Sequence, residues 1–213
     1  MSESIYEVSS KLVKFNENLK IFDLEEIKTQ IQASIAVQLD IMDHEKLLTQ
    51  ISQLSLACVR SLRNGGKIIF AGNGGSFADA QHLSAEFTSR FLFERAPLAS
   101  LALGTNNSAI SAIGNDYGYE QVFARELRGI AKPEDVFIPI STSGNSSNIF
   151  AAVVVAKEVG ATAVALTGET GGKLKSICEC ICVPSPETAR IQECHILVGH
   201  ILCGLVEKAY FQK

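Results

Sequence analysis

The stretch KIIFAGNGGSFADAQHLSAEF, residues 67–87, decides the fold. It opens with a short apolar run, passes through Asn73-Gly74-Gly75-Ser76 and continues at once into a helix-forming sequence. More apolar runs follow later in the chain, separated by helical stretches, and this alternation is typical of a parallel sheet covered on both faces. The later runs are LASLAL (98–103), DVFIPIST (135–142), TAVALTG (162–168) and ECICVPS (179–185). The sequence therefore predicts an α/β fold.

Helices are predicted between these runs and before the first of them. Apolar residues recur at helical spacing from Ile51 to Leu62, and Asn64-Gly65-Gly66 is suited to end that helix. The predicted helices cover residues 3–18, 24–40, 44–63, 77–91, 120–130, 148–159 and 189–210. We expect a single domain over residues 1–213, in which 1–65 form an N-terminal helical layer and 66–213 the α/β core.

The composition narrows the class of protein. Hydrophobic residues make up 46% of the 213 residues and charged residues 20%, which excludes a disordered chain. The net charge of -4 shows no basic excess of the kind that nucleic-acid binders usually carry. The sequence has no run of 18 apolar residues and no secretory signal pattern, so we expect a cytoplasmic protein without membrane or nucleic-acid partners.

The six cysteines are expected to be reduced thiols. Cys178, Cys180 and Cys182 alternate along a predicted strand, so their side chains would point to one side of the sheet. Zinc-binding cysteines usually occur as C-x-x-C instead. We interpret these three as small, buried apolar residues.

The helix predicted over residues 189–210 is apolar over most of its circumference, which is more than one core-facing stripe requires. Such a helix must be covered on two sides. We expect a symmetry-related copy of the chain to supply the second cover. The alternative is that the N-terminal helices of the same chain lie over it.

Two predicted strands end in loops suited to an anion. In an open parallel sheet, ligands bind beyond the carboxyl ends of the strands. The glycines at 74 and 75 let backbone N–H groups approach a ligand at a helix N-terminus. The segment 141–146, STSGNS, adds four hydroxyls before another helix. The two loops predict a phosphate monoester site, although segment 141–146 could be an ordinary helix cap followed by a turn.

The first loop is not a dinucleotide-binding fingerprint, because Phe77 stands where the third glycine is needed. On the helix that follows, His82 and Glu86 are four residues apart and share one face, which suits two ligands of one metal ion. A surface contact between the two would give the same spacing. His44 is interpreted as a surface residue.

Five motifs together resemble the sugar isomerase (SIS) family, in the expected order and spacing over about residues 45–210. They are AGNGGSFADAQHLSAEF, SAIGNDYGYE, PISTSGNSSNI, ALTGETGGKL and ARIQECHILVGH. The resemblance implies a flavodoxin-like fold and a homotetramer with sites at subunit interfaces. It also implies zinc-dependent conversion of sedoheptulose 7-phosphate to D-glycero-D-manno-heptose 7-phosphate, the first step toward the heptose units of lipopolysaccharide or related glycans.

The same resemblance assigns roles to residues. His82, Glu86, Gln192 and His200 match the zinc ligands, and Glu86 and His200 also match the acid/base pair. The substrate-binding positions are Asn73, Gly74, Gly75, Ser76, Glu86, Asn115, Asp116, Ser141, Thr142, Ser143, Ser146 and Gln192. Phe77 departs from the family, whose members usually carry a small or polar side chain there.

The spacing of Gln192 and His200 conflicts with a shared ion. Eight residues on one continuous helix separate them by about 12 Å along the axis, whereas metal–ligand bonds measure about 2.0–2.2 Å. Either Gln192 lies in a frayed or bent first turn, or the two residues come from different subunits.

Two other functions fit the same fold. One is a non-catalytic relative that acts as a DnaA initiator-associating regulator, and the other is a sugar-phosphate sensor domain. Such a regulator would lose the acid/base residues, and a sensor would accompany a basic recognition helix. The chain keeps Glu86 and His200 and shows no such helix, which favours the enzyme.

Overall fold

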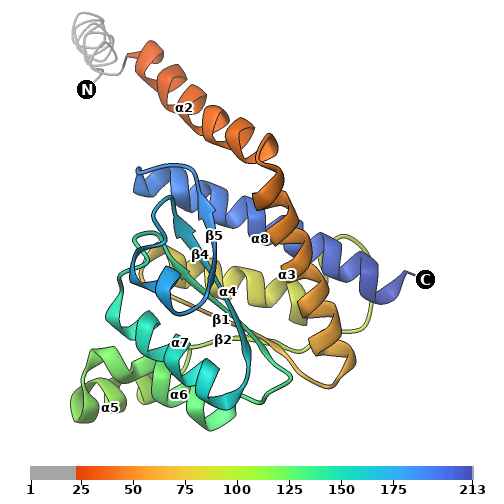
Figure 1. Ribbon diagram of the computed structural model, residues 1–213, viewed down its shortest axis with the longest axis vertical. Coiled ribbons are helices and arrows are strands. Elements are labelled where there is room, and N and C mark those ends of the chain that lie inside the picture. The colour runs from red at the N-terminus through yellow and green to blue at the C-terminus, as the bar shows by residue number, and fades with distance from the viewer. Residues whose placement is uncertain (1–22, 213) are drawn as a thin grey trace, which may run out of the picture. The chain divides into compact units, whose positions relative to one another are not determined.

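The computed structural model describes residues 23–212. The chain divides into two compact units, residues 1–36 and 37–213, and the sheet lies in the second. The helices are α2 (Leu24–Met42), α3 (Glu45–Arg63), α4 (Gly75–Thr88), α5 (Asn107–Tyr117), α6 (Val122–Ile130), α7 (Ser147–Val159) and α8 (Thr188–Phe211), with short 3-10 helices η1 (Tyr119–Gln121) and η2 (Gly172–Ser176) (Figure 1). The helix predicted over 3–18 lies outside the described residues. That the whole chain forms one domain stays a prediction.

Within residues 23–212, five parallel strands form one sheet in the order β2-β1-β3-β4-β5. They are β1 (Ile68–Gly72), β2 (Ser100–Ala102), β3 (Val136–Ser141), β4 (Thr162–Gly168) and β5 (Glu179–Val183). This order confirms the flavodoxin-like prediction. The chain passes from β1 to β2 on one side and then returns to β3 on the other, so the crevice at the switch point opens beyond the ends of β1 and β3.

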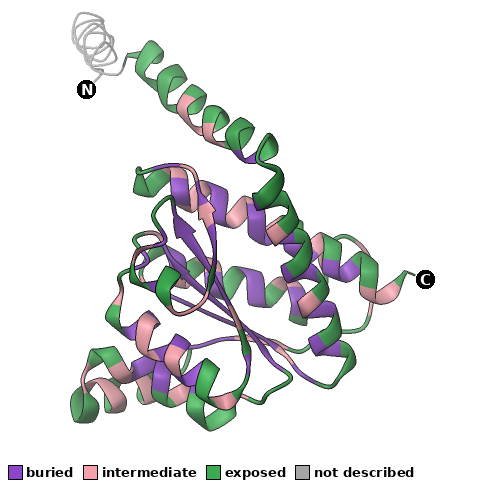
Figure 2. Cartoon of the chain, in the orientation of Figure 1, coloured by how far each residue is buried: buried purple, intermediate pink, exposed green. Residues whose placement is uncertain are grey.

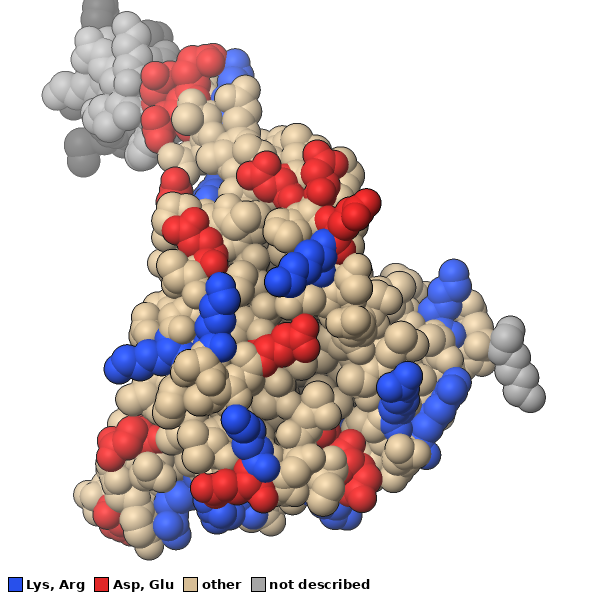
Figure 3. Space-filling model, viewed as in Figure 1, with Lys and Arg blue, Asp and Glu red and all other residues tan. Residues whose placement is uncertain are grey.

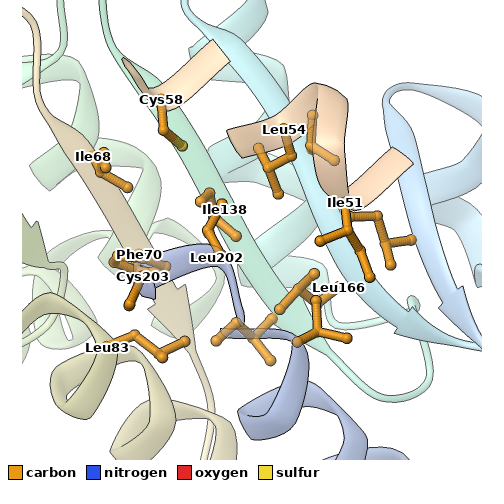
Figure 4. Packing of buried hydrophobic residues seen from close by; sticks show 14 of the residues in the cluster. Ile51, Leu54, Cys58, Ile68, Phe70, Leu83, Ile138, Leu166, Leu202 and Cys203 are labelled. Atoms are coloured by element: carbon orange, nitrogen blue, oxygen red, sulfur yellow. The ribbon is translucent and has the colours of Figure 1, made fainter. Parts of the chain in front are cut away.

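One face of the sheet packs against α3, α4 and α8. Side chains that alternate along the strands point to this face, among them Phe70 on β1 and Ile138 on β3. Figure 4 shows how Leu83 of α4 and Leu202 of α8 close over them. The remaining labelled side chains in that layer are Ile51, Leu54, Cys58, Ile68, Leu166 and Cys203.

The opposite face packs against α6 and α7. Ile69 and Phe137 point to this side, where they meet Leu127 of α6 and Val153 of α7. Every residue of β1 and β3 is therefore buried, and the strands appear purple along their length in Figure 2. Cover on both faces explains why these strands read as continuous apolar runs.

The last helix is covered partly by the chain itself. Helix α8 buries Cys194, Val198 and Leu202, among others, and α3 packs directly against it. The alternative that an N-terminal helix covers α8 is therefore confirmed for α3. Ile201 and Leu205 nevertheless stay 39% and 43% exposed. Of the described helices, α8 alone is long and apolar enough to cross a membrane by length and composition, and here it packs as a core helix.

The free edges of the sheet are β2 and β5. Strand β2 is three residues long, shorter than the predicted 98–103, although Leu98 and Leu103 are both buried. At the other edge, the Gln50 side chain of α3 donates hydrogen bonds to the Cys180 carbonyl (3.3 Å) and to Glu179 (3.1 Å). Each edge is therefore shortened or occupied along part of its length.

The structure shows the state and burial of the cysteines and the distribution of the surface charges. All six cysteines are free thiols. Cys180 is buried as expected, but Cys178, just before the edge strand β5, and Cys182, within that strand, are only half-buried. Figure 3 shows acidic and basic side chains interspersed over the visible face of the molecule.

Candidate functional site

His82 and Glu86 of α4 meet His200 of α8. His82 Nε2 lies 3.2 Å from Glu86 Oε1 and 3.0 Å from His200 Nε2. The helices approach closely here because Gly199 has no side chain: a Cβ at that position would lie 2.5 Å from the methyl carbons of Leu83. Leu83 follows His82 on α4, and Gly199 precedes His200 on α8. The close contact of Leu83 with Gly199 therefore brings the two histidines together.

The cluster fits a metal ion. One ligand atom from each of its three residues lies within 4.8 Å of the others. Metal bonds of about 2.0–2.2 Å at tetrahedral angles separate neighbouring ligand atoms by roughly 3.4 Å, close to the two observed distances. Two imidazoles and a carboxylate suit zinc and other divalent transition metals. The surface-contact interpretation of His82 and Glu86 does not account for the third residue, which points its Nε2 at the same place.

Asp79 also belongs to these surroundings and was missed in the sequence. Burial raises the pKa of its carboxyl, while His82 and His200 act in the opposite direction. It stands one helical turn before His82, so the i, i+3 spacing could have identified it.

Gln192 lies elsewhere. A Cβ on Gly75 would be 2.9 Å from Gln192 Nε2, so the amide rests against the start of α4, about two turns from His82. Helix α8 is continuous from Thr188, so a frayed or bent first turn does not bring Gln192 to His200. Within one chain the structure does not place Gln192 in the cluster. Its role as a ligand stays a prediction that requires a second chain.

The loop after β1 is held by a pair of amides. Asn73 and Asn148 exchange two hydrogen bonds of 2.9 Å, Nδ2 to Oδ1 in each direction. The Tyr119 hydroxyl also donates to Asn73 Oδ1, at 3.2 Å. Asn148 and Tyr119 were not among the predicted residues, although both stand inside the quoted motifs. Position alone could not reveal that their side chains turn toward Asn73.

Phe77 lines a small pocket beside this loop. The pocket, about 190 Å³, is also bordered by Asn73, Tyr119 and Phe123. Gly104 makes room for the aromatic rings, since a Cβ there would lie 3.0 Å from both Phe77 and Phe123. The absence of a side chain at Gly104 therefore accommodates the large ring of Phe77.

The loop after β3 carries several side-chain hydroxyls just before helix α7. Register pairs Gly72 with Ile140, so the loops that begin at Asn73 after β1 and at Thr142 after β3 leave the sheet side by side. The hydroxyls of Ser141 and Ser146 lie 3.2 Å apart, and Ser143 Oγ accepts a hydrogen bond from Asn145 N.

The N-cap residues are Gly74 for α4 and Ser146 for α7. Neither of these described residues caps its helix with a side-chain hydrogen bond. The third N–H of each helix is occupied, since Phe77 N donates to the Gly74 carbonyl and Ile149 N to Asn148 Oδ1. The first two N–H groups of α4 and of α7 have no such partner among the described residues and can face an anion. Ser146 does not act as the ordinary helix cap that was the alternative for this segment.

The remaining predicted residues do not belong to the cluster of His82, Glu86 and His200. Ser76 is buried in the first turn of α4. Asn115 and Asp116 lie on α5, exposed, with a 2.8 Å hydrogen bond between them. His44 is exposed as predicted but also caps α3, accepting a hydrogen bond from Leu47 N at Nδ1.

Comparison with known proteins identifies the family. Residues 32–168 match the SIS domain. The phosphoheptose isomerase of Aneurinibacillus thermoaerophilus is 55% identical over 187 residues, 87% of this chain and 94% of that protein. The phosphoheptose isomerase of Sulfurimonas denitrificans is 49% identical over 186 residues, covering 87% and 95%. A solved phosphoheptose isomerase structure from Francisella tularensis has a TM-score of 0.83 at 35% identity, covering 87% of this chain and 98% of that one.

The three similarities to individual proteins extend over most of both chains, and the family match includes helix α4. The chain belongs to the SIS domain family and, within it, to the phosphoheptose isomerases.

Proposed function

We propose that His82, Glu86 and His200 hold a zinc ion in an aldose–ketose isomerase that acts on sedoheptulose 7-phosphate. Membership of the phosphoheptose isomerases makes the chain an isomerase of heptose biosynthesis. The observation that carries the metal proposal is the convergence of two imidazole nitrogens and a carboxylate on one point. The product is D-glycero-D-manno-heptose 7-phosphate.

The reaction needs two proton movements. Converting the ketose to the aldose moves one proton between C2 and C1 and another between the two oxygens. Glu86 is suited to carry the proton between the carbons, and His200 to exchange protons with the oxygens. When bound, zinc would polarise the carbonyl and stabilise the negative charge that develops on its oxygen.

Glu86 is asked both to bind the metal and to act as the base. Its carboxylate has two oxygens, and Oε1 is the one that faces His82. Oε2 is not engaged by any described residue, which supports a division of the two roles between the two oxygens. We propose this division for the proton-transfer step.

The phosphate of the substrate is proposed to bind where α4 and α7 begin. Ser141, Ser143 and Ser146 offer hydroxyls there, and backbone N–H groups add positive partial charge. Binding energy gained at the phosphate holds the reacting carbons in place for proton transfer.

A homotetramer is proposed for the assembled enzyme. Ile201 and Leu205 leave an apolar strip of α8 exposed after α3 has covered the helix. A second chain packed on that strip would also explain how Gln192 could act as a ligand, because it could reach the metal cluster of the neighbouring chain. The cytoplasmic location is likewise an expectation from the sequence.

The test is an assay of the purified protein with sedoheptulose 7-phosphate, before and after treatment with a chelator. We expect turnover to fall by at least tenfold after the metal is removed and to return on addition of zinc chloride. Turnover that survives complete metal removal, confirmed by elemental analysis, would contradict the metal proposal while leaving the isomerase assignment in place.

A further inference from the structure

Arg95 and Glu207 form an ion pair that is removed from water. Arg95 lies in the segment between α4 and β2, and Glu207 lies near the end of α8. Their side chains are 2% and 0% exposed, and Arg95 Nε lies 2.8 Å from Glu207 Oε1. Burying two charges is costly unless every remaining donor and acceptor finds a partner. Stability alone is therefore a weak explanation for this buried pair.

Arg95 and Glu207 each form their other hydrogen bonds with the backbone of one short segment, residues 86–96. Glu207 accepts from the backbone N–H groups of Phe91 (2.9 Å) and Leu92 (2.7 Å). The Arg95 guanidinium donates to four carbonyls. They are those of Glu86 (2.7 Å), Phe87 (2.7 Å), Ser89 (2.8 Å) and Ala96 (3.1 Å). The pair thus ties the last turn of α4 and the segment after it to α8.

Two of these contacts lead directly to the metal cluster. Arg95 holds the backbone carbonyl of Glu86 itself. Glu207 holds the backbone of Phe91, whose ring stacks on the His200 ring with centroids 5.5 Å apart and planes 24° apart. One buried pair therefore reaches a cluster residue on each of the two helices.

The stack replaces a contact that metal-binding histidines usually have. The ring nitrogen that does not bind the metal normally donates to a carboxylate or carbonyl, and this fixes the orientation of the ring. No described residue forms such a hydrogen bond with His200 Nδ1. The orientation of the His200 ring is set by Phe91 on one side and His82 on the other.

We propose that Arg95 and Glu207 are positioning residues for the metal cluster, acting on Glu86 through its backbone and on His200 through Phe91. The inference rests on the proposed metal site. Residues that orient metal ligands typically change metal affinity by about 10- to 100-fold when they are replaced. The pair touches neither the metal ligands' side chains nor the strand-end loops, so its effect should appear in zinc affinity.

The chain offers a matched control. Asp135 is also a fully buried carboxylate, paired with Lys67 at 2.6 Å and accepting from the backbone N–H groups of Lys67 and Lys132. It lies immediately before β3, and its printed partners, Lys67 and Lys132, belong neither to the cluster nor to the segment 86–96. Glu207→Gln and Asp135→Asn make the same chemical change in the same kind of network.

The experiment is calorimetric titration of the metal-free wild type and both variants with zinc chloride, alongside thermal unfolding. We expect both variants to unfold at lower temperature, and only Glu207→Gln to bind zinc about 10- to 100-fold more weakly. Equal weakening in both variants would attribute the effect to lost stability and overturn the proposal. Zinc affinity within twofold of the wild type in Glu207→Gln would overturn it too.

A second variant covers the case in which Glu207→Gln does not fold. Phe91→Leu removes the stacked ring from a half-buried position and leaves the ion pair intact, so the fold should persist. We expect zinc to bind at least fivefold more weakly to this variant, and unchanged affinity would overturn the link through Phe91. If the wild type itself does not bind zinc, the metal site is refuted and the positioning role with it, whereas unchanged variants refute the positioning role alone.

Discussion

Asn73 has little of its side-chain amide left for a ligand. Its Oδ1 accepts from both Asn148 and Tyr119, and one of its two Nδ2 protons goes to Asn148. One side-chain N–H remains, so if Asn73 binds the substrate as expected from the sequence, its amide does so as a donor to an oxygen. The direction of this contact is set by residues behind the loop and not by Asn73 itself.

Replacing Asn148 should therefore act on substrate binding. In Asn148→Ala, the Asn73 amide loses its fixed orientation, and we expect KM for sedoheptulose 7-phosphate to rise by about tenfold, equivalent to about 1.4 kcal/mol. Steady-state kinetics measure this, with Tyr119→Phe as the milder companion that removes one bond to the same oxygen. An unchanged KM in Asn148→Ala would show that Asn73 needs no support.

His195 predicts how stability depends on pH. The ring is 1% exposed, Nε2 lies 3.1 Å from the Thr167 carbonyl, and Nδ1 has no partner among the described residues. Burial lowers the pKa of His195 to about 4, from an ordinary value of 6.5. Below pH 6.5 His195 binds a proton in the unfolded chain, whereas in the folded chain it stays neutral down to about pH 4. The free energy of unfolding therefore decreases as the pH is lowered from 6.5 to 4.

The expected loss between pH 6.5 and pH 4 is roughly 3 kcal/mol. His195→Gln keeps a donor for the Thr167 carbonyl but cannot titrate, so its stability should fall less over the same window. Urea unfolding of both proteins at several pH values measures the difference. Parallel curves for the two proteins would show that other groups cause the acid sensitivity.

At the scale of the elements, the strands were predictable and one helix was not. Strands buried on both faces must be apolar at every position, so β1 and β3 stand out in the sequence. Helix α5 has no buried residue and contains Gly114, Asn115 and Asp116, which favour helices weakly, so it leaves no apolar period to detect. The Asn106 side chain, which caps α5, was the signal that could have indicated it.

The candidate site was predictable in its residue types and only partly in its grouping. His82 and Glu86 share a helix, so their spacing was informative. His200 joins them through the packing of α8 on α4, which depends on the small size of Gly199. Contacts between distant segments, such as that of the Phe91 ring with the His200 ring, leave no local pattern in the sequence.

The loop after β3 depends on one glycine. Gly144 has φ +64, and a Cβ there would overlap the carbonyl oxygen of Gly171. Gly144→Ala should push the 169–172 segment away from the loop after β3, where we propose that phosphate binds. We expect kcat/KM to fall at least tenfold because the hydroxyls of that loop lose their arrangement. Gly129→Ala in α6 is the control: nothing lies within 4 Å of its Cβ position, so it should leave kcat/KM unchanged and add up to about 1 kcal/mol of stability.

Circular dichroism and steady-state kinetics on the two variants separate a local effect from a general one. A Gly144→Ala protein with wild-type kinetics would mean that the phosphate does not bind at this loop.

At the scale of the whole molecule, the structure predicts which inactive variants can complement one another in a mixed oligomer. Glu86 and His200 lie in one cluster of one chain, so subunits inactivated at either position cannot repair each other. Gln192 lies about 12 Å along α8 from His200. If a neighbouring chain supplies Gln192, mixing Glu86→Gln subunits with Gln192→Ala subunits creates complete sites.

We expect each variant alone to lose most of its turnover, by about 10²- to 10⁴-fold for Glu86→Gln. Mixed oligomers, formed by unfolding and refolding the two together, should regain part of the activity. Light scattering on the wild type gives the companion measurement, since an active monomer of 22.9 kDa would exclude any shared site. No recovery in confirmed mixed oligomers would place the complete site within one chain.

The contact of Gln50 with the edge of β5 has a consequence for the nascent chain. An uncovered edge strand offers its backbone to any other extended segment, and this is how aggregation begins. The three-residue length of β2 limits that hazard at one edge, while at the other a side chain from α3 occupies the Cys180 carbonyl. Helix α3 precedes β5 in the chain and is synthesised well before it. Gln50 is therefore already present to cover the edge of β5 when that strand emerges, and this order limits aggregation during synthesis.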